Sequence, residues 1–112
     1  NIIAKPGDSI FFYYAAYIFS NGKGKIYDTN VKEIAIENNF NVDFNLFEIR
    51  KEVVGRGKLI KGMDIGLIGS KKNEESVIIY SAKNGFGDKQ IGLIPKSSAH
   101  YVEVWIKDIK QK

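Results

Sequence analysis

The chain has 112 residues, of which 44% are hydrophobic and 27% are charged, so length and composition predict one ordinary globular domain over residues 1–112. It has no cysteine, which excludes disulfides, thiolate zinc sites and a cysteine nucleophile. The net charge of +4 comes from basic residues spread along the chain, and all but Arg50 and Arg56 are lysines. Nucleic-acid binding favours arginine forks and clustered basic stripes, so we expect no nucleic-acid partner. No apolar run approaches the roughly eighteen residues of a membrane span.

The first third of the chain predicts a β-hairpin. The run Ser9 to Phe19 is rich in β-branched and aromatic residues and is apolar on both parities, which indicates a central strand covered on both faces. Residues 20–25 are polar and glycine-rich, as is typical of a hairpin connection. A return strand then begins at Ile26 and ends at residues 28–30.

The spacing of apolar residues changes after this hairpin. Residues 31–39 have helical spacing, so we predict a short helix there, with Thr29 or Asn30 as its cap. Apolar and polar residues then alternate strictly over residues 40–46, which predicts a half-buried extended segment.

The second half predicts three more strands and one further helix. We expect strands over residues 47–54, 76–80 and 101–109, and a helix over 58–68. Two glycines in that helix lower its intrinsic stability by roughly 1 kcal/mol each relative to alanine, so packing must stabilise it. Antiparallel strands around a single central helix define an α+β domain.

Few residues suggest polar catalysis. His100 is the only histidine and has no recognisable partner, which favours a structural or surface role over that of a general base. No ligand spacing indicates a metal site, and we expect no cofactor. Asp28 lies between a strand end and a helix, and spacing alone favours a turn or cap residue there.

An apolar loop near the C-terminus is the strongest local signal of a site. Phe86-Gly87 is followed by a short polar stretch and then by Ile91-Gly92-Leu93-Ile94-Pro95. Loops are usually polar because they run over the wet surface. We therefore predict that this flap covers an apolar pocket.

With these elements placed, the chain resembles the FK506-binding-protein family of peptidyl-prolyl isomerases. Three motifs carry the resemblance in the right order: Tyr27-Asp28, the helix entry from Gly55 to Asp64, and the flap from Phe86 to Pro95. The resemblance extends from Lys5 to Ile109. It implies a strongly bent antiparallel sheet wrapped around one short α-helix, with an extra short helix and extended insertion around residues 31–46.

The resemblance also implies an activity and a site. The activity is cis-trans isomerisation of X–Pro bonds in protein chains by desolvation in an apolar cleft, which would assist folding. It implies catalytic roles for Asp28, Tyr14, Ile60 and Phe86. The substrate-binding walls would comprise Tyr27, Phe47, Leu59, Met63, Ile91, Leu93, Ile94 and Val102.

Three departures from the family pattern bear on strength of activity. Met63 stands where the family usually has tryptophan, Phe86 replaces a tyrosine, and Val102 replaces a phenylalanine. We expect proline-containing polypeptides as substrates and weakened binding of FK506-like macrolides. A low-activity peptide-binding or chaperone module, or a structural envelope component, is the competing interpretation.

The segment from Thr29 to Ala35 is similar to that of bacterial envelope members of the family, including gliding-motility-associated lipoproteins. The chain begins at Asn1 rather than Met, which we interpret as a removed upstream segment. Together these features favour an extracytoplasmic location, either periplasmic or lipid-anchored.

Overall fold

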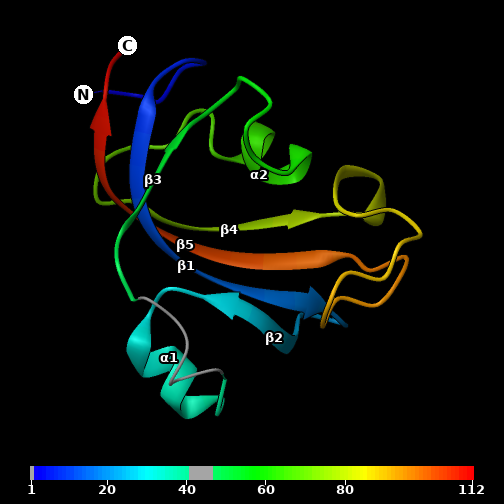
Figure 1. Cartoon of the computed structure of the whole chain (residues 1–112). Helices are drawn as coiled ribbons and strands as arrows, with labels where there is room; N and C mark the ends of the chain where they lie inside the picture. The colour runs from blue at the N-terminus through cyan, green and yellow to red at the C-terminus, as the bar shows by residue number, and fades with distance from the viewer. Residues whose placement is uncertain (1, 41–46) are drawn as a thin grey trace.

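The computed structural model describes residues 2–40 and 47–112. In this part the chain forms an α+β domain, as the sequence predicts (Figure 1). Its elements in chain order are β1 (Ser9–Phe19), β2 (Lys23–Thr29), α1 (Lys32–Glu37), β3 (Arg50–Val53), α2 (Lys61–Gly66), β4 (Glu75–Tyr80), the 3₁₀ helix η1 (Ala82–Asn84) and β5 (His100–Lys110).

The strands form one antiparallel sheet whose organising strand is β1. The order along the sheet is β2-β1-β5-β4, and β3 pairs with the first half of β1. β1 and β5 are paired along almost their full length, from Ser9↔Lys110 to Ile18↔His100. Register shifts between Phe11 and Phe12, and near Tyr17, interrupt the ladder, and such irregularities increase the local bend of a sheet. Figure 1 shows the bent sheet curving around α2.

Two apolar clusters explain why β1 is apolar on both parities. Ile10, Phe12 and Ala16 belong to the main core, which fills the space between the concave face and α2. Ala15 and Tyr17 point to the opposite face, into a smaller cluster beside α1. The prediction of a central strand covered on both faces is therefore confirmed.

Helix α2 packs closely against β4 because its glycines leave no side chain in the way. A Cβ at Gly62 would lie 2.2 Å from the Tyr80 ring, and one at Gly66 would lie 2.5 Å from Ile78 Cγ2. The two glycines that weaken the isolated helix are therefore the residues that allow the contact.

The predicted cap of α1 is wrong. The N-cap is Val31, and within residues 2–40 and 47–112 no side chain forms a cap hydrogen bond with the helix. Thr29 donates its hydroxyl proton to the Tyr14 carbonyl oxygen (2.7 Å), and the Asn30 amide donates to the Phe12 carbonyl oxygen (3.2 Å). Both side chains thus attach the end of β2 to β1, and the Thr29 hydroxyl oxygen also accepts from the N–H of Val31 at 3.0 Å.

Several element ends also differ from the sequence prediction. The strand expected over residues 47–54 is confined to Arg50–Val53, the helix expected over 58–68 to Lys61–Gly66, and β2 begins earlier, at Lys23. Most of the predicted extended segment, residues 41–46, lies outside the described residues. Within the described ranges no helix is long and apolar enough to cross a membrane.

Candidate active site

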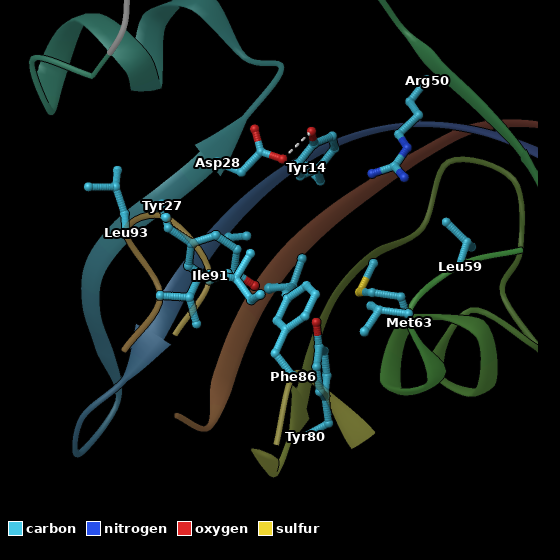
Figure 2. Close-up of a pocket in the computed structure, with 15 residues that line it drawn as sticks. Tyr14, Tyr27, Asp28, Arg50, Leu59, Met63, Tyr80, Phe86, Ile91 and Leu93 are labelled. Atoms are coloured by element: carbon cyan, nitrogen blue, oxygen red, sulfur yellow. Dashed lines mark hydrogen bonds between the residues drawn. The ribbon is translucent and has the colours of Figure 1, made fainter. Parts of the chain in front are cut away.

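A cleft of about 620 Å³ opens between the concave face of the sheet, α2 and the flap. Figure 2 shows its side chains converging from these elements. Every predicted site residue except Phe47 lies in its lining. The lining residues are Tyr14, Ala16, Tyr27, Asp28, Arg50, Leu59, Ile60, Met63, Tyr80, Phe86, Ile91, Gly92, Leu93, Ile94 and Val102.

Asp28 and Tyr14 form a hydrogen-bonded pair at the upper wall of the cleft. The Tyr14 hydroxyl donates to Asp28 Oδ2 at 2.8 Å, drawn as the dashed line in Figure 2. Burial and the nearby Asp28 carboxylate raise the pKa of Tyr14. The phenol therefore stays protonated and acts as a donor throughout the physiological pH range.

The residues after Asp28 hold this pair in place. The Tyr14 N–H donates to Asn30 Oδ1 at 2.7 Å, and the Thr29 hydroxyl donates to the Tyr14 carbonyl oxygen. The Asn30 amide also donates to the Glu48 carbonyl oxygen at 2.9 Å. The end of β2 is thereby fixed to β1 and to the chain entering β3, which sets the position of Asp28.

Ile60 is the N-cap residue of α2, directly before the first helical residue. Its carbonyl oxygen accepts from the N–H groups of Met63 and Asp64, each at 2.9 Å. In the described residues we find no acceptor for the Ile60 N–H. A half-buried N–H without a protein partner is suited to bind a carbonyl oxygen of a ligand.

The loop before Ile60 is held by a carboxylate that the sequence analysis did not single out for this role. Asp64 accepts from the N–H groups of Gly55 (2.8 Å) and Gly57 (2.9 Å). Both glycines have positive φ, at 72° and 73°, so the loop needs this restraint to keep one conformation. Because Asp64 belongs to α2, these two hydrogen bonds attach the loop to the helix and position Leu59 and Ile60 on the cleft wall.

The flap is a tight hairpin with a buried and an exposed side. Ile91 and Ile94 exchange both backbone hydrogen bonds, at 2.9 and 2.8 Å, around Gly92. Ile94 is buried, whereas Ile91 and Leu93 remain 43% and 53% exposed beside the cleft. The apolar flap thus has one side chain in the wall and two at the mouth.

The floor of the cleft is an aromatic stack around His100. The imidazole is fully buried, stacks on the Tyr80 ring at 4.6 Å and meets the Phe86 ring edge-on at 5.9 Å. The Tyr27 hydroxyl oxygen lies 2.7 Å from His100 Nδ1. His100 therefore has the structural role that the sequence favours, beneath the site.

Arg50 and Tyr80 are cleft residues that the sequence did not point to. Tyr80 is the register partner of His100, and Arg50 is the register partner of Phe12. Phe47, which we expected on the wall, instead lines a separate hollow of about 450 Å³ with Tyr13 and Trp105. Phe47 lies before β3, whereas Arg50, the first residue of that strand, lines the cleft.

The arrangement favours binding and desolvation over covalent chemistry. The polar side chains of the described lining are one carboxylate, one guanidinium and three phenols, and these lining residues include no serine, threonine or cysteine to serve as a nucleophile. In the described ranges no group of three histidine, cysteine, aspartate or glutamate side chains is placed to hold a metal ion. What remains is an apolar cleft with a small number of positioned donors and acceptors.

The fold and cleft together define a bent-sheet domain with a mostly apolar cleft between the sheet, α2 and the flap. The family described as FKBP-type peptidyl-prolyl cis-trans isomerase matches residues 1–107. A short-type peptidyl-prolyl cis-trans isomerase of Methanocaldococcus jannaschii is 30% identical over 97 residues, covering 84% of this chain and 59% of that protein. FK506-binding protein 5 of Dictyostelium discoideum is 27% identical over 107 residues, covering 95% of this chain and 6% of that protein.

FK506-binding protein 1B of Aspergillus fumigatus is 25% identical over 112 residues, covering 95% of this chain and 82% of that protein. The chain spans about three fifths of the archaeal relative and a small fraction of the amoebal one. Because the family match extends over nearly the whole chain, the chain belongs to the FKBP-type peptidyl-prolyl cis-trans isomerase family.

Proposed function

We propose that this domain catalyses the cis-trans isomerisation of X–Pro bonds in polypeptides. Family membership supports the reaction class. The observation that carries the proposal for this chain is the coincidence, in one apolar cleft, of the Asp28–Tyr14 pair and the Ile60 N–H, for which the described residues provide no acceptor. An enzyme that rotates a bond needs such a binding surface and no nucleophile.

The cleft suits the physics of the reaction. Rotation about a peptide bond has a barrier of about 18–20 kcal/mol because amide resonance must be broken. The planar amide is more polar than the twisted one, so an apolar environment destabilises the ground state relative to the transition state. Leu59, Met63 and Phe86 would surround the proline ring and exclude water from it.

Polar groups at the edge of the cleft would orient the substrate. The Ile60 N–H would donate to a substrate carbonyl oxygen and fix the peptide in register. The Asp28 carboxylate, held by the Tyr14 hydroxyl, would face the rotating amide and interact with its changing dipole. Phe86 supplies apolar surface here and no hydroxyl.

A protease-free isomerisation assay on short X-Pro peptides tests the proposal. We expect Asp28→Ala and Phe86→Ala each to lower kcat/KM by about tenfold or more, because each removes an interaction with the reacting segment. Ile36→Ala is the control, since Ile36 is 55% exposed on α1 and lies outside the cleft lining. Circular dichroism and thermal melts would show whether each variant is folded.

The assay also separates isomerase from peptide-binding module. A rate equal to that of buffer, with peptide still perturbing the cleft residues in an NMR titration, would replace the enzyme with a binding or chaperone module. Unchanged rates in both cleft variants would place the active site elsewhere.

Two finer proposals rest on particular residues. Met63, Phe86 and Val102 leave a wider cleft with one hydroxyl fewer than the family pattern, which supports weak binding of FK506-like macrolides. The similarity of residues 29–35 to bacterial envelope members supports an extracytoplasmic, lipoprotein-like location. Determination of the residues that precede Asn1 tests the location, because a secretory signal peptide would support it and a continuous cytosolic domain would contradict it.

A further inference from the structure

Arg50 brings a positive charge into an otherwise apolar cleft. Among the described residues that line the cleft, it is the only lysine or arginine, and Asp28 is the only carboxylate. Arg50 is the first residue of β3 and pairs with Phe12 of β1, which directs its side chain across the concave face. Figure 2 shows the guanidinium extending from β3 toward Tyr14.

The guanidinium is oriented before any ligand arrives. Its central carbon lies 5.4 Å from the centre of the Tyr14 ring and 5.8 Å from that of Phe12, both within cation–π range. Arg50 Nε donates to Glu52 Oε2 at 2.6 Å. An arginine held in this way loses less rotamer freedom on binding than one free in solvent.

Glu52 leaves part of the guanidinium available. The contact uses Nε alone, and in the described residues no hydrogen bond of the two terminal nitrogens is found. The Arg50 side chain is 39% exposed, so a ligand in the cleft can reach these nitrogens. Two terminal N–H groups on a planar fork match the two oxygens of a carboxylate.

The two charges divide the cleft into ends of opposite polarity. Asp28 already accepts a hydrogen bond from Tyr14, whose ring lies between the carboxylate and the guanidinium in Figure 2. An acidic side chain on a bound peptide would therefore be attracted to the Arg50 end and repelled from the Asp28 end. Because water is partly excluded, this discrimination is stronger than on an open surface.

We propose that Arg50 is a specificity-determining residue that selects prolyl bonds flanked by an acidic residue, through a carboxylate–guanidinium contact. This inference rests on the proposed function for its substrate, an X–Pro segment in the same cleft. It adds a preference that the apolar walls alone cannot give. A neutral side chain of the same shape, glutamine, would bind in the same place without the charge-assisted contact.

The experiment compares peptide pairs that differ by one charge. Fluorescently labelled peptides carry glutamate or glutamine, either immediately before or immediately after a single proline, and their dissociation constants are measured by anisotropy at low and high salt. We expect the wild-type protein to bind the glutamate peptide about three- to tenfold more tightly at one of the two positions, the size of a partly exposed charge-assisted contact. The ratio should shrink with added salt.

Variants of the two arginines of the chain provide the matched comparison. Arg50→Met should bring the glutamate-to-glutamine ratio close to one, and Arg50→Lys should restore part of it. Arg56→Met removes the same charge from a residue outside the cleft lining and should keep the wild-type ratio. Equal binding of both wild-type pairs, an unchanged ratio in Arg50→Met, or an equal loss in Arg56→Met would each overturn the proposal.

Binding and turnover keep the two proposals distinguishable. If the charge preference is present and the isomerisation assay shows no rate above buffer, the proposed function fails and the role of Arg50 in recognition stands. If peptides are isomerised with no charge preference, Arg50 is not the selector and the enzyme stands. Should Arg50→Met fail to fold, the wild-type ratio and its salt dependence still decide.

Discussion

At the residue scale, His100 shows how one buried imidazole can order the aromatic floor of a cleft. Its Nδ1 is engaged by the Tyr27 hydroxyl, and its buried Nε2 has no hydrogen-bond partner in the part of the chain that the structure describes. A Cβ at Gly85 would lie 2.5 Å from that Nε2, so glycine leaves the space that the ring needs. The imidazole is therefore packed as an apolar ring with one polar contact.

This environment makes the stability of the domain depend on pH. Burial lowers the pKa of His100, and the titratable groups facing it are the phenols of Tyr27 and Tyr80. In the unfolded chain the imidazole has a pKa of about 6.5. As the pH falls below that value, the unfolded state binds a proton at His100 more readily than the native state does. The free energy of unfolding should fall by up to about 1.4 kcal/mol per pH unit below 6.5.

Urea unfolding at pH 7.5, 6.0 and 5.0 measures this slope. His100→Leu is the control, because His100 is the only histidine and the variant should be flat over the same interval. A slope that persists in the variant would assign the effect to another group. Asp8, whose pKa is lowered by hydrogen bonds from the backbone N–H groups of Lys5 and Lys112, contributes only as the pH falls below about 4.

At the element scale, the contact between α2 and β4 sets the width of the cleft. The ring of Tyr80 lies directly against the backbone at Gly62, and Tyr80 and Met63 both line the cleft. Any group added at Gly62 must push the helix away from the sheet or displace the ring. The helix is therefore positioned by the absence of a side chain.

Gly62→Ala tests that dependence. Alanine raises helix propensity by about 1 kcal/mol, but overpacking against a buried ring costs about 1–3 kcal/mol, so the net free energy of unfolding should fall. Denaturant unfolding would measure this change. Ile65 of the same helix is 56% exposed, so the control variant Ile65→Ala should change the free energy of unfolding by less than about 0.5 kcal/mol. A Gly62→Ala protein that is more stable than the wild type would show that the close approach of α2 to Tyr80 does not require glycine at this position.

Much of the element order was predictable because it rests on local periodicity. The bounds of β1 match the prediction, since its apolar residues on both parities leave little ambiguity. The cleft residues Arg50 and Tyr80 were not predicted, because they reach the cleft through pairing with Phe12 and His100, and long-range register leaves no local pattern. The predicted cap of α1 is wrong because the Asn30 side chain bonds to the backbone of Tyr14 and Phe12 instead of to the first N–H groups of the helix.

At the scale of the whole molecule, the long β1–β5 ladder makes the domain a single unit. Its pairs join residues 9–18 to residues 100–110, so most of the chain must be in place before the ladder can close. Each of the other three strands of the described residues pairs with one of these two: β2 and β3 with β1, and β4 with β5. Such non-local pairing predicts slow and cooperative folding.

Phe12→Ala tests the cooperativity. Phe12 is fully buried in β1, and its truncation should cost about 3–5 kcal/mol. Trp105 fluorescence reports on β5 and far-UV circular dichroism on the whole sheet, and we expect both transitions to move together to lower denaturant. The exposed residue Ile79 supplies the control variant Ile79→Ala. Separate midpoints for the two probes would indicate an independently unfolding part.

The ladder has a mechanical consequence, because Ser9 and Lys110 are paired neighbours at the same end of the sheet. Figure 1 shows both chain ends emerging there, away from the flap. Tension applied through the two ends would first load the contacts of the end segments, Ile3 with Lys71 and the Lys112 N–H with Asp8, and then the Ser9–Lys110 pair and each following pair in turn. The β1–β5 ladder should therefore open one pair at a time when the ends are pulled, even though thermal unfolding of the domain is cooperative.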